Sequence, residues 1–224
     1  KGGKISNVTL LDPRYTRYAD GERNEQVSMM QPEHEVFGVE LKSVNDNSTF
    51  LSDEFTFDCE QSKEENAQVV RMTLNLSDNS SLVYIYKIYN TGNPSRDYLI
   101  DFDIVEHNIA KHLAANESLK LTWRSRSNKN ERSYQNENMA TNIIYFEDGD
   151  MEEFDTSGEK ETLENISWIA YKQQYFTSAF ISSENLMAEA EFKNSTKQGA
   201  DFMKDFKSTI SLPLSKDKTT YNYA

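Results

Sequence analysis

Three histidines are the side chains of this sequence best suited to acid–base or metal chemistry. His107 and His112 lie close together in the chain, and Glu106 or Glu117 could supply a third metal ligand. A helical turn would place both imidazoles roughly on one side. No His-Glu-x-x-His sequence accompanies them, and His34 falls in a predicted loop. We therefore expect solvated or capping histidines and no metal site.

Acidic pairs and the only cysteine offer little further chemistry. Asp101 and Asp103 share one face of a predicted strand, as paired carboxylates of a hydrolase might, but a solvated strand face shows the same alternation and is favoured. Cys59 alternates with Phe55 and Phe57, which predicts a small buried hydrophobic side chain. Phosphate-binding glycine loops and nucleophile elbows are absent from the sequence. We predict no catalytic residue, no cofactor and no enzymatic activity.

The charge balance excludes several kinds of partner. The chain carries 24 Lys and Arg against 37 Asp and Glu, a formal net charge of −13. Nucleic-acid binding needs cationic patches that displace counterions, so neither DNA nor RNA is an expected partner, and an anionic lipid surface is not one either. Solubility is the simplest explanation of the charge, and a preference for basic partners is the second. The sequence contains no apolar run of about eighteen residues that could span a membrane.

Alternation of apolar and polar residues with period two dominates the chain and predicts an all-β fold. Strands are expected at 4–11, 35–41, 53–59, 70–76, 81–90, 97–107, 119–124, 142–147, 159–164, 166–171, 174–182, 186–193 and 210–214, and loops at 12–26, 45–48, 61–66, 125–138 and 147–160. Weak helix signals are confined to 107–117, 129–139 and 199–206. Segment 81–89 is apolar on both faces, so it should be a central strand that forms a hairpin with 97–107. Many closely spaced strands with few short helices predict an antiparallel β-sandwich or β-barrel, and the absence of a linker favours one domain over residues 1–224.

Tyrosines on neighbouring predicted strands are the candidates for a binding surface. Tyr84, Tyr86 and Tyr98 lie on adjacent strands, and Tyr171 lies further along the chain. Aromatic faces give a large contact area at low entropic cost, so a cleft lined by these rings would suit a peptide, a sugar ring or a protein partner. The favoured alternative is that the rings fill the core of the sandwich.

The most distinctive stretch runs from Ile166 to Ile181. Its two strands meet at a tight connection, which predicts a hairpin buried on both faces. The side chains of Gln173 and Gln174 could satisfy backbone groups at that turn. Replacing Trp168 by alanine should then cost of order 3–5 kcal/mol of stability if the ring is fully buried.

This stretch resembles the segment of YidC-type membrane protein insertases in which a tryptophan strand leads through a Gln-Gln-Tyr-Phe tract into a second strand. The residues that carry the resemblance are Trp168, Gln173, Gln174, Tyr175, Phe176 and Ala179. Gly2 and Gly3 also precede an apolar strand, as in the first strand of the large exported domain of that family. The sequence is thus similar to the periplasmic domain of a bacterial insertase, and its Asn- and Lys-rich composition suggests a Bacteroidetes-like source.

The resemblance implies a twisted β-sandwich of the galactose mutarotase-like super-sandwich type at the periplasmic face of the bacterial inner membrane. It also implies an accessory role, because the insertase activity of the family belongs to membrane helices that this chain lacks. Such a domain assists the insertion and folding of inner-membrane proteins through contacts with Sec translocon components and client membrane proteins. The family domain extends past Ala224, so we expect a soluble, monomeric domain that is incomplete at its C-terminus.

Two other functions compete with the accessory role. A carbohydrate- or peptide-binding β-sandwich module would use the same aromatic residues. A mutarotase-like sugar-active enzyme ranks last, because that chemistry needs a general acid and a general base across a cleft, and no histidine falls on a clear interior strand face.

Overall fold

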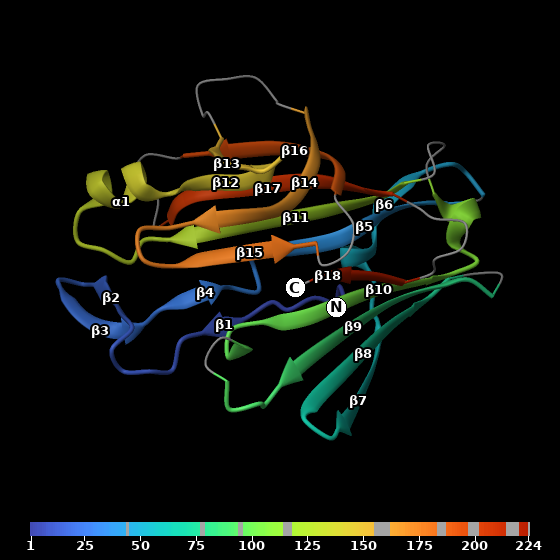
Figure 1. Ribbon diagram of the computed structural model, residues 1–224, viewed down its shortest axis with the longest axis horizontal. Coiled ribbons are helices and arrows are strands. Elements are labelled where there is room, and N and C mark those ends of the chain that lie inside the picture. Colours follow the sequence, from blue (N-terminus) through green and yellow to red (C-terminus); the bar gives the residue numbers. More distant parts are fainter. Residues whose placement is uncertain are drawn as a thin grey trace.

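The computed structural model describes residues 1–43, 45–76, 79–93, 96–113, 118–154, 162–182, 187–196, 202–213 and 220–223. Within these ranges the chain forms two antiparallel sheets with two short strand pairs beside them (Figure 1). The larger sheet forms the upper layer of the view, and the smaller sheet fans out below it. This arrangement confirms the predicted antiparallel β-sandwich.

The smaller sheet has five strands in the order β18–β10–β9–β8–β7. They are β7 (Asp58–Glu64), β8 (Ala67–Asn75), β9 (Ser81–Tyr89), β10 (Ile100–His107) and β18 (Thr220–Tyr223). The middle strand is β9, and residues 82–86 of this strand are buried on both faces. It pairs with β10 from Ile88 opposite Ile100 to Ser81 opposite His107. The predicted central strand and its hairpin are therefore confirmed.

The larger sheet has nine strands, eight of them in the order β13–β12–β14–β16–β17–β11–β5–β6. Their bounds are β5 (Val36–Lys42), β6 (Thr49–Leu51), β11 (Ser118–Asn128), β12 (Asn142–Glu147), β13 (Asp150–Glu153), β14 (Thr162–Lys172), β16 (Met187–Ser195) and β17 (Phe202–Pro213). The ninth, β15 (Thr177–Ile181), pairs only with the second half of β14, whose first half pairs with β16. Asn165, with a φ of 57°, lies at the junction of the two halves. The predicted strands 159–164 and 166–171 are one strand over the described residues.

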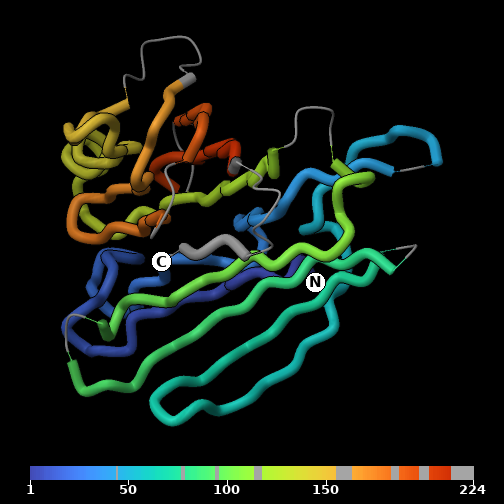
Figure 2. The backbone as a smooth tube through the Cα atoms, turned by 45° about the vertical axis from the view of Figure 1, so that its right-hand side comes forward, coloured from blue at the N-terminus to red at the C-terminus, as the bar shows by residue number. Residues whose placement is uncertain are grey.

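The N-terminal region forms the two short pairs. β1 (Val8–Thr9) pairs with β4 (Ser28–Met30), and β2 (Thr16–Ala19) pairs with β3 (Glu22–Gln26). Figure 2 shows these blue strands at one end of the molecule, beneath the orange and yellow part of the larger sheet. The described helices are the α-helix α1 (Tyr134–Ala140) and the 3₁₀ turns η1 (Ser52–Glu54) and η3 (Ile109–His112). None of them is both long and apolar enough to cross a membrane.

Aromatic rings occupy the core. Tyr84 on β9 stacks on Phe57 with ring centroids 5.2 Å apart and meets Phe102 edge-on at 5.4 Å. Within the larger sheet, Trp123 on β11 stacks on Tyr171 of β14 at 3.8 Å. The larger sheet therefore curls so that the end of β14 packs over β11.

Several local predictions are wrong, and most of them concern polar strands at sheet edges. The predicted strand 53–59 is a 3₁₀ turn followed by β7, an edge strand on which every residue is exposed. Cys59 is therefore exposed and not buried. The predicted loop 12–26 contains β2 and β3. The described part of the predicted helix 199–206 belongs to β17.

Candidate functional site

A cavity of about 570 Å³ lies between the two sheets beside the N-terminal strands. Its walls are largely apolar, and they come from both sheets and from the segments before and between them. The lining residues are Ile5, Val8, Leu10, Tyr15, Met29, Met30, Glu35, Phe37, Tyr86, Tyr98, Leu99, Ile100, Phe102, Trp123, Tyr175, Phe176, Thr177, Ser178, Ala179, Phe180 and Ile181.

The residues that line the cavity differ in exposure, and this difference defines the mouth and the floor of the cavity. Tyr98 and Tyr175 are 77% and 68% exposed, so they stand at the mouth. Phe102, Trp123 and Phe180 are buried, so they form the floor. A ligand that entered past these tyrosines would meet a lining of aromatic and aliphatic side chains.

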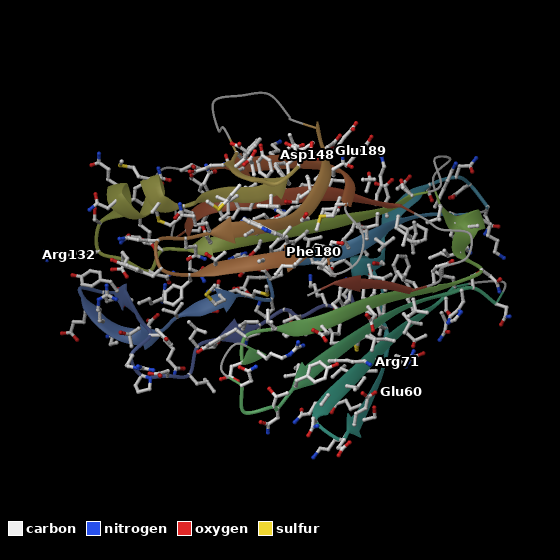
Figure 3. All side chains as sticks on the ribbon, viewed as in Figure 1. Glu60, Arg71, Arg132, Asp148, Phe180 and Glu189 are labelled. Carbon is white, nitrogen blue, oxygen red and sulfur yellow. The ribbon has the colours of Figure 1, made fainter. Side chains whose placement is uncertain are left out.

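Phe180 joins the floor of the cavity to both sheets. Its ring centroid lies 6.0 Å from that of Phe37 and 6.4 Å from those of Phe102 and Trp123. Figure 3 shows this residue on β15 in the middle of the molecule, between the two layers. These tilted and edge-on contacts hold β15 beside β5, β10 and β11.

Glu35 is the only charged residue among the described residues that line the cavity. Its side chain is 5% exposed and accepts a hydrogen bond from the Ser125 hydroxyl at 2.8 Å. Burial raises the pKa of the Glu35 carboxyl to about 7, although Ser125, the backbone amides of Gln31 and Arg126, and the charge of Lys4 favour its ionised form. The cavity therefore contains a desolvated carboxyl group that titrates near neutral pH.

Lys4 is a cation whose charge acts on this carboxyl group. Its ammonium donates to the backbone carbonyl of Glu35 and forms an ion pair with Asp53 at 2.8 Å. Because Asp53 already pairs with Lys4, the Glu35 carboxyl has no ion-pair partner of its own among the described residues.

β15 hydrogen-bonds to β14 through every second residue. The amide of Ser182 donates to the carbonyl of Ser167 at 2.9 Å. Hydrogen-bonded and non-hydrogen-bonded pairs alternate along an antiparallel ladder. In the observed register, Ser178 and Phe180 therefore point their backbone groups toward β14.

The residues between them point their backbone groups the other way. Thr177, Ala179 and Ile181 direct their N–H and C=O groups away from β14, and no other described strand pairs with that side of β15. Thr177 and Ala179 are exposed. All of β15 lines the cavity. We call these outward backbone groups of Thr177, Ala179 and Ile181 the free edge of β15.

Comparison with known sequences identifies the family. A sequence model described as the YidC periplasmic domain matches residues 1–223. The chain belongs to the YidC periplasmic domain family. This confirms the resemblance found in the hairpin motif, and it confirms the periplasmic location that the resemblance implied.

Individual relatives of this YidC-family domain come from Bacteroidetes. It is 27% identical over 217 residues to the membrane protein insertase YidC of Azobacteroides pseudotrichonymphae, covering 95% of this chain and 33% of the relative. It is 30% identical over 155 residues to that of Bacteroides fragilis, covering 66% and 25%. The Porphyromonas gingivalis protein is 24% identical, with 96% and 32% covered. The proteins of Azobacteroides pseudotrichonymphae and Porphyromonas gingivalis match almost the whole of this chain, which spans about a third of their length.

The family motif is built around a buried polar contact at the hairpin turn. Gln173 is buried, and its side-chain oxygen accepts a hydrogen bond from the Asn130 amide at 2.8 Å. The backbone amides of Asn130 and Glu131 donate to the Glu137 carboxyl at 2.7 and 3.0 Å. Gln173 thus ties the turn to the segment before α1, whereas the sequence had suggested that its side chain binds backbone groups of the turn. The side chain of Gln174 donates to the Tyr175 hydroxyl at 3.1 Å.

Other motif residues lie on the two faces of the hairpin. Trp168 is half-buried and stacks on Phe146 of β12, with centroids 5.8 Å apart, on the face opposite the core. Phe176 meets Tyr15 edge-on at 5.9 Å in the cavity wall. Ala179 is exposed. The hairpin is therefore not buried on both faces, because β15 is an edge strand covered by the core on one side only.

The four tyrosines proposed as binding residues separate into two pairs. Tyr86 and Tyr98 line the cavity, and Tyr86 also donates to the Gly3 carbonyl at 2.9 Å. Tyr84 and Tyr171 are enclosed in the core, where burial raises the pKa of both hydroxyls above the usual range. Neither of these two rings lines the cavity. Their placement fits the alternative that tyrosines fill the core and gives no support to a binding role.

None of the histidines belongs to the cavity lining within the described residues. His112 is buried and its Nδ1 contacts the Lys42 carbonyl at 3.3 Å, while His107 is exposed. The described side chains contain no cluster of three His, Cys, Asp or Glu that could hold a metal ion.

Sequence reasoning missed Glu35 and the free edge of β15. The alternation of Glu35 with Phe37 and Val39 was the available signal, because residues two apart on a strand share a face. To recognise Glu35 as a cavity residue from this signal, one had to know that the strand face that carries Phe37 points inward.

Proposed function

We propose that this chain is an accessory periplasmic domain of a membrane protein insertase that assists the insertion and folding of inner-membrane proteins through protein–protein contacts. The observation that carries the proposal is the family match over residues 1–223, together with relatives that are all named membrane protein insertases. The domain spans only about a third of those relatives. In this proposal, insertion itself belongs to the remainder of the protein, and the domain contributes binding.

The partners in this proposal are client membrane proteins and components of the Sec translocon. The cavity between the sheets is the surface through which we propose that the domain binds them. Its exposed aromatic mouth, at Tyr98 and Tyr175, and its apolar walls resemble the composition of protein-binding sites, in which tyrosine is enriched.

The aromatic lining also favours a second candidate, a module that binds a carbohydrate or a short peptide without a protein partner. Sugar rings stack on exposed tyrosines such as those at the mouth. A mutarotase-like enzyme has less support, because Glu35 is the single ionisable acid or base, apart from tyrosines, among the described residues that line the cavity. A general acid–base pair across the cleft would need a second such group.

Photo-crosslinking in living cells tests the proposal. A photoreactive residue is introduced at Tyr98 or Tyr175 in the complete protein that carries this chain, with Glu60 on β7 as a control position on the far edge of the smaller sheet (Figure 3). We expect adducts to Sec components or nascent membrane proteins from the two tyrosines and few from Glu60. Reproducible absence of protein adducts in a folded, functional protein would reject the proposal and favour the small-ligand module.

A further inference from the structure

The free edge of β15 is a template for strand addition. Thr177, Ala179 and Ile181 direct N–H and C=O groups to the side of β15 away from β14, where no strand of the described residues pairs with them. An extended polypeptide can satisfy such groups by pairing as one more strand. The edge contains neither proline nor a charged side chain, which are the usual devices that prevent pairing.

The pleat of such an added strand would direct every second side chain into the cavity. Residues opposite each other in adjacent strands point to the same face of the sheet. A residue added opposite Ser178 or Phe180 would therefore share the inward face on which Phe180 meets Phe37 and Trp123. The cavity of about 570 Å³ has room for a long side chain there.

The chemistry of the floor favours a positively charged side chain. Glu35 is the only charged group of the described lining, and its carboxyl has lost most of its contact with water. Phe37, Phe102 and Trp123 surround the same space, and aromatic faces attract ammonium and guanidinium groups. Lys4, whose charge acts on Glu35, is already paired with Asp53. The net charge of −13 would also attract a basic segment toward the domain.

We infer that the free edge of β15 and the adjoining cavity form one binding site for an extended polypeptide segment, whose lysine or arginine side chain enters the cavity toward Glu35. This inference rests on the proposed function, because it specifies the kind of protein segment that the accessory domain binds. The backbone of the segment pairs with Thr177, Ala179 and Ile181, and the basic side chain supplies selectivity.

Peptide binding to the chain of residues 1–224 tests the inference. The probe is a fluorescein-labelled nonapeptide of alternating threonine and valine with a central lysine, and the matched probe has norleucine in place of lysine. Fluorescence anisotropy at pH 8 gives both dissociation constants. We expect the lysine peptide to bind at least about tenfold more tightly than the norleucine peptide.

Matched variants separate the two parts of the site. Glu35→Gln should reduce the preference for lysine to about twofold or less, whereas Glu60→Gln, which removes the same charge from an exposed position, should retain it. Ala179→Pro removes one outward N–H of the free edge and leaves the ladder to β14 intact, so it should weaken both peptides about tenfold. Ala179→Val keeps that N–H, so it should bind both peptides more tightly than Ala179→Pro does.

Three outcomes would overturn the inference: no saturable binding of either peptide, equal affinity for both peptides, or equal affinity of the proline and valine variants. Melting curves identify any variant that fails to fold. If Ala179→Pro or Glu35→Gln fails to fold, the affinities of the two peptides are still compared in the folded variants Ala179→Val and Glu60→Gln. Failure of this test would leave the proposed function separately testable, because crosslinking in cells at Tyr98 and Tyr175 does not depend on a basic side chain or on strand pairing.

Discussion

The hydroxyl of Tyr171 donates a hydrogen bond to the backbone carbonyl of Trp123 at 2.8 Å, and the two rings stack with centroids 3.8 Å apart. Tyr171 lies near the end of β14, and Trp123 lies in the middle of β11 and in the cavity floor. The same hydroxyl contacts the Ser208 hydroxyl at 2.9 Å. One buried side chain of the hairpin therefore holds part of the cavity floor in position.

Removing that hydroxyl should destabilise the fold without changing the shape of the core. In Tyr171→Phe, the buried Trp123 carbonyl and the Ser208 hydroxyl lose a partner, so the free energy of unfolding should fall by about 1–3 kcal/mol. Tyr98→Phe is the matched control at an exposed position and should change stability by less than about 0.5 kcal/mol. Urea unfolding of both variants measures the difference, and equal stabilities would mean that the buried hydroxyl contributes nothing.

Glu35 should make stability depend on pH. Its pKa in the folded chain is raised to about 7, so between the pKa of an unfolded glutamate and pH 7 the folded state holds a proton that the unfolded state has released. Stability should therefore fall as pH rises through this window. Glu35→Gln cannot ionise, so its stability relative to the unmodified chain should increase from pH 5 to pH 8, by at most about 3 kcal/mol.

Thermal melts at both pH values measure this trend, and Glu60→Gln at an exposed position should show none. A trend of opposite sign for Glu35→Gln, with stability lost at pH 8, would show that ionised Glu35 stabilises the fold.

The two adjacent glutamines of the motif should differ in their effect on stability. Gln173→Ala leaves the buried Asn130 amide without its acceptor, so it should cost about 1–3 kcal/mol. Gln174→Ala loses only a contact with the exposed Tyr175 hydroxyl and should cost less than about 0.5 kcal/mol. Chemical denaturation of both variants measures the two costs. Equal costs would contradict the assignment of Gln173 as the structural member of the pair.

Trp168 should contribute less than a fully buried tryptophan. It is half-buried and packs on Phe146 outside the core, so Trp168→Ala should cost about 2 kcal/mol, below the 3–5 kcal/mol typical of buried large aromatics. Trp168→Phe keeps a ring against Phe146 and should recover most of that loss. An unchanged melting temperature for the alanine variant would mean that the ring serves binding and not stability.

The parts of the fold that sequence predicted are those with strong alternation. Segment 81–89 is apolar on both faces, and Val70, Met72 and Leu74 alternate clearly, so the centre of the smaller sheet was predictable. β3 and β7 are exposed throughout and β2 is half-buried along its length, and such strands show no apolar period. Cys59 was wrongly predicted as buried from its alternation with Phe55 and Phe57, because alternation cannot show that a strand lies at a sheet edge.

The site was predicted only in part. Tyr86 and Tyr98 were proposed for a cleft and do line the cavity, but Tyr171 points from β14 to β11 because the larger sheet curls. A single sequence contains no signal for that curl. The inward position of Glu35 depends on the same long-range packing.

Residue-resolved amide hydrogen exchange by NMR tests the central claim, that the free edge of β15 and the cavity bind an extended segment. In the free chain, the amides of Thr177, Ala179 and Ile181 should exchange quickly, while those of Ser178 and Phe180, bonded to β14, should exchange slowly. Saturating lysine peptide should slow the three outward amides at least about tenfold and leave Ser178 and Phe180 unchanged. Unchanged exchange at Thr177, Ala179 and Ile181 under saturating peptide would contradict the account.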